Sequence, residues 1–186
     1  MNFSINHYGW GQTGPFPEVS GSINTDGQQL IIKFDVREPE IRAVYSFHNE
    51  MVCNDSCVEF FFSPYPFDKR YINIEVNPIG TVLAYIGEGR HNRIPLSEEQ
   101  IYSFGAKTTI DRSNALAHWT LQYVVPYSLI AEVYGQEPIS EMNVIRCNFY
   151  KCGDSLKNPH WGSWMPIETE NPDFHRPEYF VEVALN

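Results

Sequence analysis

The sequence has no long hydrophobic run and few basic residues, and both absences exclude classes of partner. No apolar stretch approaches the roughly 20 residues that a membrane-spanning helix requires. Only 13 Lys and Arg residues stand against 23 Asp and Glu, which gives a net charge of −10. Phosphate backbones and anionic lipids repel such a chain. We therefore expect no nucleic-acid partner and no membrane partner.

Signals for export and for common enzyme classes are also missing. The first eight residues contain neither a basic stretch nor an apolar stretch, so the sequence predicts no signal peptide and favours the cytoplasm. The chain contains no Gly-x-Ser-x-Gly elbow, no His-Glu-x-x-His helix and no glycine-rich phosphate loop. These absences argue against the hydrolases and nucleotide-dependent enzymes that carry such motifs.

Cysteine is scarce, with four residues in two close pairs, Cys53 with Cys57 and Cys147 with Cys152. Three and four residues separate the members of the two pairs, which matches a zinc ribbon poorly. We expect free, partly buried thiols. A disulfide between the pairs is the alternative, and it would indicate an oxidising compartment.

Aromatic residues, by contrast, are abundant at 15%, and 13 Pro and 12 Gly residues punctuate the chain. Aromatic and β-branched residues favour pleated, half-buried strands, and Pro and Gly mark turns. Alternating or strongly apolar segments predict strands at 30–37, 56–63, 71–77, 81–86, 101–111, 116–125, 144–151 and 178–185. Pro126 to Tyr134 has helical spacing and ends at Gly135. The whole chain, residues 1–186, is predicted to be a single all-β domain, an antiparallel sandwich of Ig-like or jelly-roll type with about nine or ten strands and one short helix.

The segment from Tyr71 to Asn77 carries the first candidate site. Side chains two residues apart share a face of a strand. The isoleucines and valine of this segment therefore face the core, and the other face carries Tyr71, Asn73, Glu75 and Asn77. A ring, amides and a carboxylate can hydrogen-bond sugar hydroxyls, which both donate and accept. A solvated outer face of an antiparallel sheet would show the same alternation.

A second strand, Val144 to Lys151, repeats this pattern with Arg146, Asn148 and Tyr150 on one face. If both strands lie in one sheet, their polar faces form one patch. Arg and Asn are poor strand formers, which favours a functional reason for their presence. We therefore take Tyr71, Asn73, Glu75, Arg146 and Asn148 as candidate sugar-binding residues.

Glu59 and two tryptophans complete the candidate set. Glu59 shares a face with Cys57 and Phe61, and a carboxylate on a mostly apolar face requires a partner. That partner is either a bound sugar or metal ion, or an arginine such as Arg146. Trp161 and Trp164 lie in a Pro- and Gly-containing segment, where we expect one ring to be buried and the other to be available for stacking on a sugar.

These motifs together resemble the family 9 carbohydrate-binding modules. The resemblance is carried by Asp55-Ser56-Cys57-Val58-Glu59-Phe60-Phe61-Phe62, by 71–80, by 146–150, by Trp164 and by Phe174-His175-Arg176-Pro177-Glu178-Tyr179-Phe180. It implies a β-sandwich related to the DOMON superfamily that binds sugar without catalysis and can hold structural calcium. It also implies that Glu59 and Asn73 hydrogen-bond the sugar and that Trp161 or Trp164 stacks on it.

This chain departs from the family pattern at one wall of the site. The family's first stacking tryptophan precedes the Asp-Ser-x-x-Glu strand, where this chain has Glu50-Met51-Val52-Cys53-Asn54. Tyr45, Phe47 and Met51 are the candidates to replace that ring. We therefore expect a non-catalytic protein that binds a mono- or oligosaccharide, and the identity of the sugar stays open.

Three other functions are compatible with the sequence. A scaffold that has lost sugar binding would fill the polar face with side chains. A glycoside hydrolase would use a carboxylate pair drawn from Asp55, Glu59 and Glu75. Haem binding, as in some DOMON relatives, would need axial ligands such as Met51, His118 or His175, and no spacing selects a pair among them.

Overall fold

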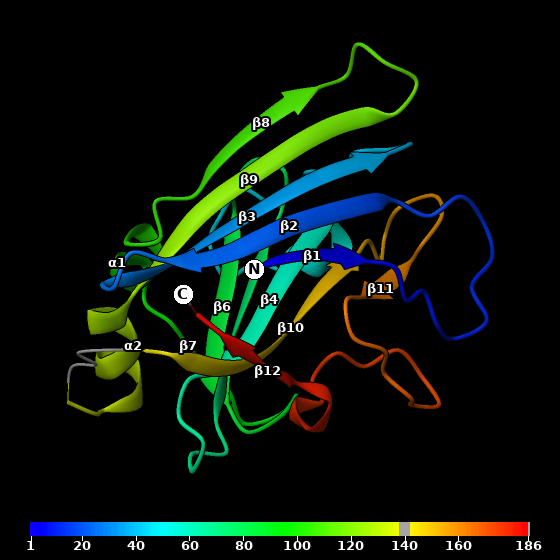
Figure 1. Cartoon of the computed structure of the whole chain (residues 1–186). Coiled ribbons are helices and arrows are strands. Elements are labelled where there is room, and N and C mark those ends of the chain that lie inside the picture. The colour runs from blue at the N-terminus through cyan, green and yellow to red at the C-terminus, as the bar shows by residue number, and fades with distance from the viewer. Residues whose placement is uncertain (138–141, 186) are drawn as a thin grey trace.

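The chain folds into a β-sandwich of two antiparallel sheets, as predicted. The computed structural model describes residues 1–137 and 142–185. The first sheet has five strands in the order β1-β2-β3-β9-β8. Figure 1 shows these strands side by side across the second sheet. Their bounds are β1 (Asn2–Ile5), β2 (Glu18–Thr25), β3 (Gln29–Glu38), β8 (Lys107–Asp111) and β9 (Ala117–Pro126).

The second sheet has seven strands and carries the candidate site. Six of them follow the order β11-β10-β4-β5-β6-β7, and β12 pairs with β10 outside this path. Their bounds are β4 (Cys57–Ser63), β5 (Tyr71–Val76), β6 (Val82–Gly87), β7 (Ile94–Pro95), β10 (Val144–Cys152), β11 (Trp161–Ser163) and β12 (Val181–Ala184). The two predicted polar strands, β5 and β10, therefore lie in one sheet, with β4 between them.

The helical content exceeds the one short helix that the sequence predicts. The predicted helix is α2 (Tyr127–Tyr134), which ends at Gly135 in a left-handed conformation. The predicted strand at 101–111 is wrong in its first half, because α1 (Glu98–Tyr102) begins at a capping box formed by Ser97 and Gln100. Two 3₁₀ turns, η1 (Val52–Asn54) and η2 (Pro177–Tyr179), lie beside the site.

The main core lies between the sheets and is strongly aromatic. Phe3 of β1 stacks on Phe149 of β10, with ring centroids 3.7 Å apart. Phe60 of β4 stacks on the same Phe149 at 4.9 Å. Every second residue of β4 and β5 points into this core, including Ile72 and Ile74. The predicted inward face of β5 is therefore confirmed.

The outer face of the seven-stranded sheet is also covered. A second cluster of buried side chains lies on it: Val52, Cys57, Phe61, Tyr71, Leu83, Tyr150, Cys152, Phe174 and Phe180. Several of its members come from η1 and from residues 153–180, a segment after β10 that is mostly loop apart from β11 and η2. The outer side chains of β5 are therefore buried rather than solvated. No helix in the described part of the chain is long and apolar enough to cross a membrane.

Candidate functional site

A cleft of about 760 Å³ opens on the outer face of the seven-stranded sheet. Its floor is formed by β4, β5, β6 and the end of β10, and its walls come from η1, the 88–93 loop and the segment after β10. The charged residues that line it are Glu59, Glu75, Arg90, Arg93, Asp154 and Asp173, and the aromatic ones are Tyr85, Trp161 and Phe174. Such a combination of charged groups and rings can bind a small polar ligand.

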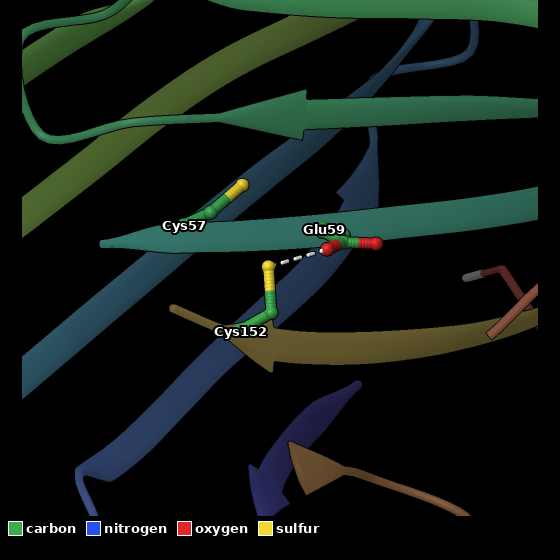
Figure 2. A group of neighbouring side chains, drawn as sticks. All are labelled: Cys57, Glu59 and Cys152. Atoms are coloured by element: carbon green, nitrogen blue, oxygen red, sulfur yellow. Dashed lines mark hydrogen bonds between the residues drawn. The ribbon is translucent and has the colours of Figure 1, made fainter. Parts of the chain in front are cut away.

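Two carboxylates lie side by side on the floor of the cleft. Glu59 on β4 is directly opposite Glu75 on β5, so both side chains project from the same face of the sheet. Glu75 accepts a hydrogen bond of 3.1 Å from the Asn73 amide. Glu59 accepts one of 2.9 Å from the Cys152 thiol, which Figure 2 shows pointing toward it from β10. Both glutamates therefore have neutral hydrogen-bond donors.

Burial makes this pair easy to protonate. Glu59 and Glu75 are 3% and 5% exposed. Burial, together with the neighbouring Glu75 charge, raises the pKa of Glu59 well above its ordinary value. Burial also raises the pKa of Glu75 to about 7, although Arg93 and the Asn73 amide oppose the shift. Near neutral pH the pair therefore holds a proton, and it can both donate to and accept from a ligand hydroxyl.

The walls of the cleft place an aromatic ring and two guanidinium groups near this pair. The Trp161 indole donates a hydrogen bond of 2.8 Å to Asp154, which holds the ring in place. Arg90 pairs with Asp173 at 2.9 Å. The Arg93 guanidinium lies over the Tyr85 ring, 5.1 Å from its centroid. The same group donates to the side-chain oxygen Oδ1 of Asn73 at 3.0 Å.

The predicted site residues therefore separate into three groups. Glu59, Glu75 and Trp161 line the cleft. Asn73 is fully buried and contacts the cleft indirectly, because its amide connects Glu75 to Arg93. The Tyr71 hydroxyl hydrogen-bonds His175 Nδ1 at 2.7 Å and is likewise buried.

The other three candidates hold the chain around the cleft in place. Arg146 donates to the carbonyl oxygens of Pro177 and Phe180 at 3.1 and 3.2 Å, and so it does not pair with Glu59. Asn148 donates to the Met165 carbonyl and accepts from its amide, at 3.1 and 3.0 Å. Trp164 packs against the main core near Phe149, with ring centroids 5.6 Å apart. Of the two tryptophans, Trp161 is therefore the one at the cleft.

Several cleft residues were not identified from the sequence. Arg90, Arg93 and Asp154 line the cleft from loops. Loops have no hydrophobic periodicity, and charged residues are common in them, so the sequence pattern does not single these three out. His175, named above only as a possible haem ligand, hydrogen-bonds the Tyr71 hydroxyl and also lines the cleft. Burial and the nearby Arg93 lower the pKa of His175 to about 3, so its ring is neutral. Met51, a candidate to replace the missing tryptophan, lines the cleft and is 55% exposed.

Asp55, the third carboxylate named for hydrolysis, has a structural environment. It is fully buried and pairs with Arg42. It also accepts hydrogen bonds from the backbone amides of Val44 and Tyr45, at 2.9 and 3.1 Å. These contacts fix the segment that leads to η1. Structural calcium stays a prediction. Of the haem candidates, His118 lies on β9 of the five-stranded sheet beside Asp35, whereas His175 lies in a loop over the outer face of the other sheet.

The comparison with protein families agrees with this geometry. The family model described as carbohydrate-binding family 9 matches residues 2–185. The chain belongs to carbohydrate-binding family 9. Its fold matches a crystal structure of a carbohydrate-binding protein candidate from Bacteroides uniformis, with 31% identity and a TM-score of 0.87, over 100% of this chain and 86% of the other.

Two solved family 9 structures contain a sugar. Both are of a module from Caldicellulosiruptor kristjanssonii. Its glucose complex matches at 14% identity and a TM-score of 0.57, over 99% of this chain and 84% of the other. Its cellotriose complex matches at 10% identity and a TM-score of 0.55, over 98% and 82%. At these sequence identities, the similarity to the Caldicellulosiruptor kristjanssonii module shows a shared fold and nothing more. No curated protein sequence matches the chain.

Proposed function

We propose that this chain binds a mono- or oligosaccharide reversibly in the cleft above Glu59 and Glu75 and leaves the sugar chemically unchanged. The observation that carries the proposal is the carboxylate pair at the base of an open cleft with an indole on its wall. Carboxylates and carboxylic acids hydrogen-bond sugar hydroxyls, and the Trp161 ring offers an apolar surface to the C–H face of a pyranose.

Membership of family 9 supports a sugar as the ligand, as do the glucose and cellotriose complexes of a structural relative. The open cleft favours ligand binding over a pure scaffold, because a scaffold would fill this face with side chains. Arg90 and Arg93 add hydrogen-bond donors beside the acidic pair. The Arg93–Asn73–Glu75 hydrogen bonds connect one wall to the floor, which holds these donors in a fixed arrangement.

Calorimetric titration with glucose and cellotriose, followed by a glycan array, tests the proposal. Trp161→Ala should weaken binding about tenfold or more, because a stacked ring contributes on the order of 1 kcal/mol beyond its buried area. Trp161→Phe keeps an aromatic ring but loses the hydrogen bond to Asp154. Its sugar affinity should therefore lie between those of the parent protein and Trp161→Ala. Phe67→Ala is the control, because Phe67 is 99% exposed and lies outside the cleft. Folded protein that binds no sugar on the array would refute the proposal.

Hydrolysis is the second candidate, because the opposed carboxylates are the feature that glycosidases also use. Side chains directly opposite across a sheet have Cβ atoms about 4.5–5.5 Å apart, and retaining glycosidases separate their carboxyl groups by about 5–5.5 Å. A glycosidase, however, places its two groups on either side of the scissile bond, whereas Glu59 and Glu75 are neighbours on one floor. Prolonged incubation with cellotriose should leave it intact, and the release of shorter sugars that Glu75→Gln abolishes would favour hydrolysis.

A further inference from the structure

Three side chains of types that bind metal ions meet beside the cleft floor. The Cys57 Sγ, a Glu59 carboxylate oxygen and the Cys152 Sγ all lie within 4.8 Å of one another, and all three residues are buried. Figure 2 shows Cys57 and Glu59 on β4 and Cys152 at the end of β10. Two facts of sheet geometry bring them together. Cys57 and Glu59 are two residues apart and share a face, and Cys152 is directly opposite Cys57.

No basic side chain compensates Glu59 by an ion pair among the described residues. Its directly opposed neighbours are Glu75 and Tyr150. Lys151 follows Tyr150 in the sequence, but its ammonium pairs with Glu38 at 3.0 Å. A carboxylate buried without a cation is costly unless it is protonated or acquires one. The position beside two thiols therefore suits a cation that binds sulfur as well as oxygen.

We propose that Cys57, Glu59 and Cys152 bind one thiophilic divalent cation, with Zn²⁺ as the best match. Zinc accepts thiolate and carboxylate ligands in tetrahedral sites, and three protein ligands leave one position for water or another ligand. Glu59 and Cys152 also line the cleft, so the open position is accessible from it. Calcium does not suit this donor set, because it takes oxygen ligands.

The protonation balance is simple. Burial, with the nearby carboxylates, raises the pKa of Cys152, and burial likewise raises that of Cys57. Without metal both are therefore thiols. Metal binding replaces both S–H bonds with S–metal bonds and releases two protons to solvent, with a third if Glu59 is protonated, and no electron is transferred. The exchange puts a divalent cation beside Glu59 on the side that faces the cysteines, opposite to Glu75.

One of the two remaining cysteines provides a matched control. Cys147 lies on the same strand as Cys152, but its side chain points into the core between the sheets. Cys53 lines the cleft and is only partly buried, and its backbone carbonyl, rather than its thiol, contacts the Cys152 thiol, at 3.5 Å. Because Cys53 lines the cleft itself, Cys147, whose thiol lies on the other face of the strand, is the matched control.

The test is a titration of the reduced, full-length protein with Co²⁺ as a spectroscopic probe, followed by displacement with Zn²⁺, in the absence of sugar. We expect one metal per chain and sulfur-to-cobalt charge-transfer absorption. Cys57→Ser and Cys152→Ser should each lower that absorption by about half or more, because each removes one of the two thiolate ligands. They should also weaken Zn²⁺ binding by more than the roughly tenfold to 100-fold cost of losing an outer-sphere partner. Cys147→Ser should bind the metal as the parent protein does.

If Cys57→Ser or Cys152→Ser fails to fold, Glu59→Gln still tests the proposal. This variant retains both thiols and the shape of the side chain, and should weaken binding at least tenfold while charge-transfer absorption persists. Three outcomes would overturn the proposal: no stoichiometric metal, equal loss in Cys147→Ser and Cys152→Ser, or a Cys57–Cys152 disulfide that persists under reducing conditions. Because no sugar is present, failure here leaves the sugar-binding proposal to its own test.

Discussion

Replacing Glu75 with glutamine should stabilise the folded chain at neutral and alkaline pH and leave it unchanged at acidic pH. The carboxylate is buried beside Glu59, and burial raises its pKa from 4.5 to about 7. The glutamine side chain that replaces Glu75 is neutral, so its burial carries no cost of desolvating a charge. Its oxygen can still accept the Asn73 hydrogen bond, and its NH₂ group can donate toward Glu59.

The sign and size of the effect follow from linkage. Below about pH 4.5 Glu75 is protonated in both states and costs nothing. Between about pH 4.5 and 7 the unfolded chain releases this proton while the folded chain keeps it, so the free energy of unfolding falls by about 1.4 kcal/mol per pH unit. Above about pH 7 the full loss of about 3 kcal/mol persists. Glu59 contributes with the same sign, because its pKa is also raised.

Urea unfolding followed by tryptophan fluorescence at a series of pH values measures this effect. The stability difference between Glu75→Gln and the parent should rise from near zero at about pH 4.5 to about 3 kcal/mol at about pH 8. Glu182→Gln, an exposed glutamate of β12 in the same sheet, should stay within about 0.5 kcal/mol throughout. A difference that does not change with pH would refute the buried-pair reasoning, as would a variant less stable than the parent at alkaline pH.

Two further substitutions test the packing that supports the site. Lys151→Met removes the ammonium that lies 3.0 Å from Glu38 and leaves that carboxylate buried without a cation. Chemical denaturation should show that the free energy of unfolding falls by about 3–5 kcal/mol. An unchanged denaturation midpoint would contradict the pairing. Gly21→Ala would place a methyl group 2.3 Å from both the Lys33 carbonyl oxygen and the Phe3 ring. Thermal unfolding should show a clear drop in Tm, with a cost of about 1–3 kcal/mol, and a parent-like Tm would mean that β1 and β2 are not packed as described.

The alternation of β4 and β5 was sufficient to predict which side chains share a face, but not how that face is covered. A period of two places Asn73 and Glu75 opposite the core, and the structure agrees. It does not say that residues 153–180 fold back over the same face and bury Tyr71 beneath His175 and Phe180. That covering depends on a mostly loop segment far from β5 in the sequence, and such a segment has no hydrophobic periodicity from which its position could be predicted.

The pairing of Glu59 with Glu75 was equally hidden. Both lie on outward faces by alternation, yet only the register of β4 on β5 makes them direct neighbours, and a slip of one residue would put one of them in the core. The missed helix α1 differs, because its Ser97 and Gln100 capping box was present in the sequence. The predicted strand began at Ile101, whose buried apolar side chain fits a helix as well as a strand.

The register also explains why one floor can support both proposals. β4 pairs with β5 on one side and with β10 on the other, so Glu59 has Glu75 as one neighbour and lies two residues from the Cys57–Cys152 pair. One oxygen of Glu59 accepts from the Cys152 thiol, while its side chain lines the cleft. Burial and repulsion from Glu75 raise the pKa of Glu59, and a cation on the cysteine side would offset that repulsion. If both proposals hold, zinc should therefore narrow the difference in folding stability between Glu75→Gln and the parent at alkaline pH.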